Sequence, residues 1–93
     1  MKILNFQEFQ MPTGINRAGW RTGDAREAMA DLVYKNVNGV AAHRLAFKIY
    51  ESNGNTEYSE DEALLIVRVA EAFATPAFID GLNEQINNQT KTD

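Results

Sequence analysis

Apolar residues recur at helical spacing in four stretches of the chain, separated by turn-forming residues. The first begins after Asp24, which has Glu27 three residues later in the spacing of a capping box, and it ends at Asn-Val-Asn-Gly, residues 36–39. The other stretches cover residues 40–52, 59–74 and 76–87. Threonine and proline at 75–76 separate the last two. The pattern predicts three or four short helices.

The expected helix over residues 40–52 is apolar on two faces. One face carries Ala42, Leu45, Ala46 and Ile49, and the other carries His43, Phe47 and Tyr50. A helix with two apolar faces needs cover on two sides. Either this helix is the central element of the fold, or its aromatic face meets a partner.

The segment Tyr-Ser-Glu-Asp-Glu-Ala-Leu-Leu-Ile-Val, residues 58–67, places three acids directly before an apolar run. Ser59 and Glu62 have capping-box spacing, and acids in a first turn are stabilised by the helix dipole. The sequence therefore predicts a helix start here, with the acids acting in stability and not as metal ligands or acid–base groups.

Residues 1–23 show no helical period. We expect a short strand near residues 2–6, a turn at Pro12-Thr13-Gly14 and a second extended piece near residues 15–21, the two pieces forming a hairpin. Trp20 is expected to plug the end of a small core.

Together these patterns predict a mainly α fold of three to four short helices, with an N-terminal extended segment or β-hairpin packed against them. Residues 1–87 are expected to form a single small domain. Residues 88–93 are expected to be a flexible C-terminal tail.

The composition of this 93-residue chain indicates the cellular compartment that suits it. It has no cysteine, which suits a reducing compartment. It lacks the run of about 18 apolar residues that spans a membrane, and its N-terminus lacks the unbroken apolar core of a secretory signal. We therefore expect a cytoplasmic protein that does not enter the membrane.

The net charge of −4 is unevenly distributed. Residues 1–50 hold seven basic and four acidic side chains, a net of +3, whereas residues 51–93 hold two basic and nine acidic ones, a net of −7. Such asymmetry can drive head-to-tail association. The favoured interpretation is that the two halves pack beside each other and neutralise their fields.

Residues suited to catalysis are sparse. His43 is the one histidine, and Ser52 and Ser59 are the only serines, both expected at helix ends. The chain has no phosphate-binding glycine loop and no metal-ligand spacing such as H-E-x-x-H. We predict no catalytic, cofactor-binding or metal-binding residue, no enzymatic activity, and a partly buried His43.

Nucleic-acid binding is the alternative function. Arg17, Trp20, Arg21 and Arg26 lie close together in the sequence, and a tryptophan among arginines can stack on a base. The pI near 4.9 argues against a large basic footprint, so nucleic acid is the less favoured partner.

Residues 30–86 resemble small proteins encoded in tailed bacteriophages and prophages. The matching pieces are "RLAFKIYES" and "YSEDEALLIV". The resemblance implies a non-enzymatic accessory or assembly role, in the head–tail or tail genes, within the bacterial host cytoplasm or the virion. It assigns a role to no individual residue.

The sequence thus predicts a protein-interaction or assembly module that associates with itself. The residues expected to bind the partner are His43, Phe47, Tyr50 and Leu64.

Overall fold

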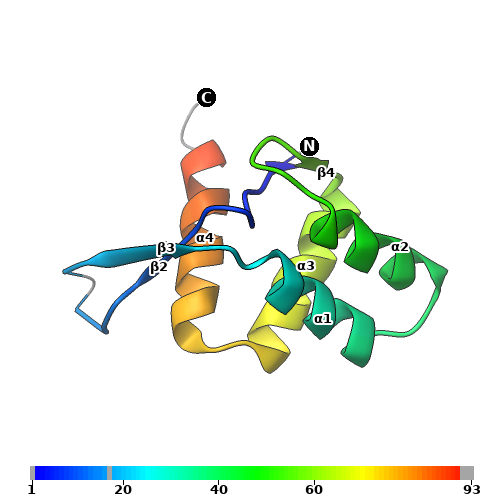
Figure 1. The fold of residues 1–93 in the computed structure, drawn as a ribbon, viewed down its shortest axis with the longest axis horizontal. Coiled ribbons are helices and arrows are strands. Elements are labelled where there is room, and N and C mark those ends of the chain that lie inside the picture. Colours follow the sequence, from blue (N-terminus) through cyan, green and yellow to red (C-terminus); the bar gives the residue numbers. More distant parts are fainter. Residues whose placement is uncertain (1, 17, 91–93) are drawn as a thin grey trace.

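The computed structural model describes residues 2–16 and 18–90, with side chains described as far as residue 87. Within these residues the chain forms four helices and two small antiparallel sheets (Figure 1), which confirms the expected fold class. The elements, in chain order, are β1 (Lys2–Ile3), β2 (Phe9–Pro12), β3 (Trp20–Gly23), α1 (Arg26–Asn36), α2 (Val40–Tyr50), β4 (Glu57–Tyr58), α3 (Glu60–Phe73) and α4 (Pro76–Thr90).

The expected pairing of residues 2–6 with residues 15–21 is wrong. β1 pairs with β4, with Lys2 opposite Tyr58, while the hairpin is formed by β2 and β3, with Pro12 opposite Trp20. The cause is a turn after β1, in which the Glu8 N–H donates to Asn5 Oδ1 at 2.8 Å. This turn redirects the chain, so the segment that pairs with β3 begins only at Phe9.

Helix α1 begins later than its sequence predicts. The N-cap is Ala25, and Asp24 does not cap the helix as expected, so the box with Glu27 is not formed. Instead the Asp24 carboxylate accepts hydrogen bonds from the backbone and guanidinium of Arg26. The Ala25 N–H donates to the Phe6 carbonyl at 2.7 Å, which ties the helix start to the N-terminal segment.

Helix α4 is longer than expected. Thr75 Oγ1 accepts from the Phe78 N–H at 3.3 Å, and proline occupies the first helical position, as the sequence predicts. The helix continues to Thr90, so residues 88–90 are helical, in contrast to the tail expected from residue 88. Residues 91–93 lie outside the described part of the chain.

The core lies between the N-terminal segment and the four helices. Leu4, Phe6 and Phe9 from the first ten residues are essentially fully buried. They join buried side chains from every helix in one cluster, which includes Met29, Val33, Leu45, Ile49, Ile66, Ala70, Phe78 and Leu82. The extended segment is therefore an integral part of the core.

The start of α3 confirms the capping box. Ser59 Oγ accepts from the Glu62 N–H at 3.1 Å, and Glu62 Oε1 accepts from the Ser59 N–H at 2.8 Å. Two backbone donors that the helix itself cannot satisfy are thereby paired.

Replacing Ser59 by alanine is expected to lower the free energy of unfolding by about 0.5–2 kcal/mol, because the Glu62 N–H loses its acceptor. Asp61→Asn is the matched control and should cost only a few tenths of a kcal/mol through the helix dipole. Urea unfolding followed by circular dichroism measures both. Equal stabilities of Ser59→Ala and the wild type would contradict the capping role.

Helix α4 approaches the hairpin at Gly81. A Cβ added there would meet the Gln10 carbonyl oxygen far inside van der Waals contact and Phe9 Cε2 at 3.0 Å. Glycine at this position lets the helix lie directly on the backbone of β2.

Gly81→Ala is therefore expected to destabilise the protein by about 1–3 kcal/mol, as overpacking does. This cost outweighs the stabilisation of roughly 0.5–1 kcal/mol that a glycine-to-alanine substitution normally brings to a helix. Gly23→Ala is the control, since a Cβ there meets nothing within 4 Å. Thermal unfolding of both variants tests this prediction. An increase in melting temperature for Gly81→Ala would contradict the close approach of α4 to β2.

Candidate interaction surface on helices α1 and α2

Helices α1 and α2 are joined by a short link, residues 37–39, and lie side by side (Figure 1). Gly39 has a φ of +112°, a backbone conformation that glycine adopts without strain. The link thus permits the sharp reversal that brings Tyr34, near the end of α1, beside the first turns of α2.

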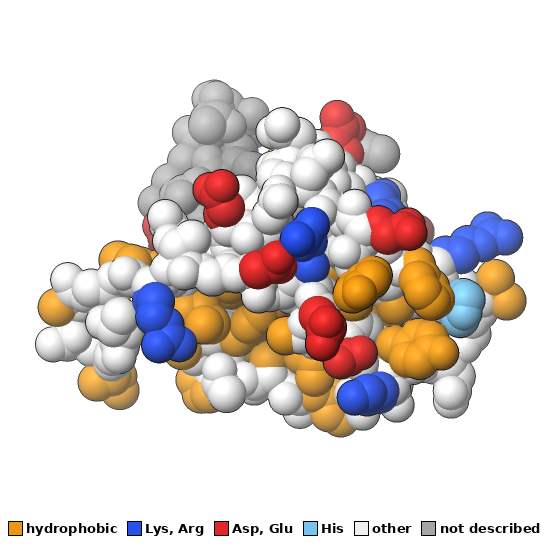
Figure 2. Space-filling view, in the orientation of Figure 1, with side chains coloured by type: hydrophobic (Ala, Val, Ile, Leu, Met, Phe, Trp, Pro, Cys, Tyr) orange, Lys and Arg blue, Asp and Glu red, His pale blue; other side chains and the backbone are white. Residues whose placement is uncertain are grey.

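Three rings from these two helices touch one another. The Tyr34 ring centroid lies 6.1 Å from that of His43 and 6.0 Å from that of Phe47, and the His43 and Phe47 rings are 5.0 Å apart. All three side chains are exposed, as is Tyr50 one turn beyond Phe47. We call Tyr34, His43, Phe47 and Tyr50 the aromatic surface. Figure 2 shows hydrophobic side chains gathered beside the single histidine on this face.

A shallow groove runs through the aromatic surface. Its volume is about 190 Å³. Tyr34, Phe47 and Tyr50 form its walls together with two alanines and one acid, Ala30, Ala46 and Asp31. The groove, named here the α1–α2 groove, is therefore mainly apolar with a carboxylate at its border.

The expectation of a partly buried His43 is wrong. The opposite face of α2 is buried in the core and carries Ala42, Leu45, Ala46 and Ile49. The helix packs against the rest of the protein through this face. His43 lies on the other face and is exposed against Tyr34 and Phe47.

The structure brings together three of the four residues expected to bind a partner. Phe47 and Tyr50 line the groove, and His43 packs on Phe47. Leu64 is about half exposed, but it lies on α3 and does not line the groove. Tyr34, which the sequence analysis missed, completes the cluster. Its signal was an aromatic residue adjacent to, but outside, the apolar stripe of α1.

The border of the groove carries charges of both signs. A neighbouring depression shares Asp31 and Tyr50 with the groove and is also lined by Asp24, Arg26 and Glu27. The hydrogen bonds from Arg26 hold the pKa of the Asp24 carboxyl below its usual range, so Asp24 is ionised at neutral pH. Asp31 lies 3.8 Å from Lys35, one helical turn away.

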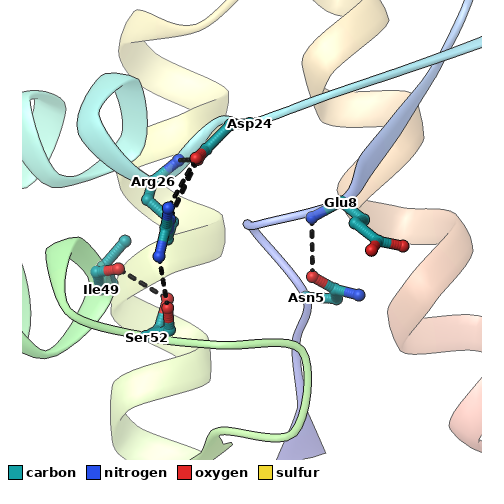
Figure 3. A network of polar contacts seen from close by, with 6 residues as sticks. All are labelled: Asn5, Glu8, Asp24, Arg26, Ile49 and Ser52. Atoms are coloured by element: carbon teal, nitrogen blue, oxygen red, sulfur yellow. Dashed lines mark hydrogen bonds and ion pairs between the residues drawn. The ribbon is translucent and has the colours of Figure 1, made fainter.

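Arg26 fixes the geometry of this border. Its guanidinium binds the Asp24 carboxylate at 2.7 Å and donates to the Ser52 carbonyl at 3.0 Å (Figure 3). The buried Ser52 hydroxyl in turn donates to the Ile49 carbonyl at 2.6 Å. The start of α1 is thereby connected to the end of α2.

Two of the residues named for the nucleic-acid alternative have acidic neighbours. Arg17 lies outside the described residues. Arg26 is engaged by Asp24, and Trp20 lines a hollow that also contains Glu8 and Glu84, whose charge repels phosphate. Arg21 is exposed on β3. Trp20 is 42% exposed and does not belong to the core cluster, so the expectation that it plugs the core is wrong.

Glu62, one of the three acids at the start of α3, has a structural role. The Glu62 carboxylate, besides capping, binds Lys48 Nζ of α2 at 2.8 Å. Among the described residues, no group of three or more histidine, aspartate or glutamate side chains could hold a metal ion. No helix in the described part of the chain is long and apolar enough to cross a membrane.

Comparisons of the chain with protein-family models, with curated proteins and with solved structures found no match.

The Glu62–Lys48 pair predicts a pH dependence of stability. Partial burial alone would raise the pKa of the Glu62 carboxyl, but hydrogen bonds from Lys48 and from the Ser59 N–H outweigh it, and the net pKa lies below the ordinary value. A carboxyl whose pKa is lowered on folding stabilises the protein above its unfolded pKa, about 4.3. That stabilisation is lost as the pH falls through the folded pKa.

Glu62→Gln retains a capping-box side chain but loses the charge. Its stability should be below that of the wild type at pH 7, and the difference should shrink as the pH falls below about 4. Urea unfolding at pH 7, 5 and 3 measures this. A difference that stays constant from pH 7 to pH 3 would show that the charge of Glu62 is irrelevant.

Proposed function

We propose that the protein is a non-enzymatic interaction module that associates with further copies of itself through the α1–α2 groove. The observation that carries the proposal is the aromatic surface, in which the rings of Tyr34, His43 and Phe47 contact one another. Its tyrosines and Phe47 remain about half exposed. Tyr34 is 56%, Tyr50 53% and Phe47 46% exposed.

Contiguous exposed apolar surface of this kind is typical of interaction sites in small soluble domains. Aromatic residues in pockets supply most of the binding free energy at many interfaces, because they bury large areas with few rotatable bonds. A groove flanked by Tyr34, Phe47 and Tyr50 provides such a pocket. Desolvation of these rings by a partner would supply the driving force.

The charged border supplies orientation. Asp31 lies in the groove wall, and Asp24, Arg26 and Glu27 lie in the adjoining depression. Charges around an apolar centre select the partner and its direction of approach more than they add affinity. A partner with an apolar side chain surrounded by polar or charged ones fits this arrangement.

An assembly or accessory role in a tailed bacteriophage or prophage accords with this proposal. It is supported by the resemblance of residues 30–86 to small proteins of such phages, and self-association is the property that an assembly protein needs. The alternative, a nucleic-acid-binding regulator using the Arg17–Arg26 region, is less favoured because Arg26 is bound to Asp24 and Trp20 lies beside glutamates.

Phe47→Ser is expected to weaken self-association roughly tenfold or more, since it removes the central ring of the groove. Sedimentation equilibrium from micromolar to millimolar protein concentration measures the effect. Phe73→Ser is the matched control, because Phe73 is similarly exposed (52%) but lies on α3, away from the groove. Thermal unfolding of each variant verifies that it is folded.

A wild type that remains monomeric to millimolar concentration would refute self-association. If Phe73→Ser or Leu64→Ser weakened association more than Phe47→Ser, the contact would lie on α3. A shift of labelled DNA that is abolished by salt and by Arg21→Ala would favour the nucleic-acid alternative.

A further inference from the structure

A hollow lies where the hairpin and the N-terminal turn meet α4. Its volume of about 330 Å³ lies at the lower end of the range of roughly 300–1,000 Å³ that is typical of small-ligand sites. Three side chains able to bind a cation line it: Glu8 from the turn after β1, Trp20 from β3 and Glu84 from α4. The other lining residues are Asn5, Gln10, Thr22, Gly81 and Gln85. We call this site the Trp20 hollow.

Contacts around the Trp20 hollow hold its parts in place. Gly81 lets the backbone of β2 lie directly on α4, because a Cβ there would overlap the Gln10 carbonyl oxygen. Gln85 of α4 accepts from the Asn5 N–H at 2.7 Å and donates to the Asn5 carbonyl at 3.0 Å. Asn5 Oδ1 in turn accepts from the Glu8 N–H at 2.8 Å (Figure 3). The backbone around the hollow is therefore in place before a ligand binds, which lowers the entropic cost of binding.

The hollow carries negative charge that the described part of the chain does not pair. Its described lining contains two carboxylates and no lysine or arginine. None of the ion pairs among the described side chains engages Glu8 or Glu84. Arg21 follows Trp20 along β3, but it pairs with Met11, and strand alternation places it on the other face of the hairpin. A positively charged ligand is therefore favoured.

We propose that the Trp20 hollow binds the guanidinium group of an arginine side chain presented by a partner protein. Trp20 is 42% exposed, so part of its indole is open to a ligand. A guanidinium stacks on an indole face through cation–π attraction and donates planar pairs of hydrogen bonds to carboxylates. Glu8 and Glu84 supply the carboxylates. The compact ammonium of lysine cannot bind a carboxylate in this planar way, so arginine fits the site better.

The Trp20 hollow is separate from the α1–α2 groove. No described residue lines both. In Figure 1 the hairpin projects at the left, whereas α2 lies at the right. One copy can therefore hold an arginine-bearing partner while its aromatic surface contacts another copy, and the inference does not depend on self-association.

The test uses the fluorescence of Trp20, which is the only tryptophan of the chain. The probe is an end-blocked pentapeptide with one arginine between glycines, at low salt. We expect a saturable change in fluorescence with a dissociation constant of about 1 mM, the weak affinity that a single side chain supports. The lysine peptide should bind more weakly. The citrulline peptide, in which a neutral urea replaces the guanidinium, should not bind detectably.

Variants of the full chain identify the groups that bind the peptide. Glu8→Gln and Glu84→Gln each remove one charge and should weaken binding of the arginine peptide roughly two- to fivefold, as expected for an exposed ion pair. Glu71→Gln is the matched control, because it removes an exposed charge on α3 outside the hollow. Trp20→Leu should also weaken binding, measured by isothermal titration calorimetry because the fluorophore is lost. Thermal unfolding verifies that each variant is folded.

Four results would overturn the proposal. The first is a wild type that shows neither a fluorescence change nor a heat of binding with the arginine peptide. The second is equal binding of the citrulline peptide, and the third is a loss with Glu71→Gln as large as that with Glu8→Gln, which would indicate attraction to the net charge alone. The fourth is tighter binding of free arginine than of the peptide, which would contradict a protein partner. Phe47→Ser should bind the peptide as the wild type does, so a failure of self-association and a failure of this site are distinguished.

Discussion

A continuous column of four aromatic rings joins the N-terminal segment to the helices. Phe78 of α4 stacks on Phe9 with ring centroids 4.5 Å apart, Phe9 stacks on Phe6 at 5.7 Å, and Phe6 meets the edge of Tyr58 at 6.1 Å. Two-stranded sheets are marginal alone in water. Here one end of the column lies at β4 and the other at α4, so both small sheets are held by the same buried rings.

The helices were largely predictable because their signals are local. Ser59 and Glu62 satisfy each other within one turn, and that prediction holds. Asp24 and Glu27 have the same spacing but form no box, because the Asp24 carboxylate accepts from the backbone N–H and the guanidinium of Arg26. The spacing of two residues describes a propensity, and a competing contact overrides it.

The strand pairing and the set of residues in the aromatic surface depend on contacts between residues far apart in the sequence. No local sequence pattern reports such contacts. Asn5 and Gln85 exchange two hydrogen bonds across 80 residues of sequence, and this places the first turn of the chain against α4. On the surface, the spacing of His43, Phe47 and Tyr50 correctly placed these side chains on one face of α2. Tyr34 joins them because α1 packs on α2, whereas Leu64 stays apart because α3 packs on α1 and α4. The periodicity of one helix carries no information about such packing between helices.

The same architecture explains why apolar groups remain at both ends. The aromatic column and the buried face of α2 complete a core in which neither Ile15 nor the outer rings of α2 take part. The charges show a parallel division. The ion pair of Lys48 with Glu62 joins the basic and acidic halves of the sequence, but Arg26 and Lys35 pair with acids of their own half. Asp24 and Asp31, which lie beside the α1–α2 groove, are therefore paired within one copy. What the fold leaves exposed at the groove is apolar surface, the rings of Tyr34, Phe47 and Tyr50.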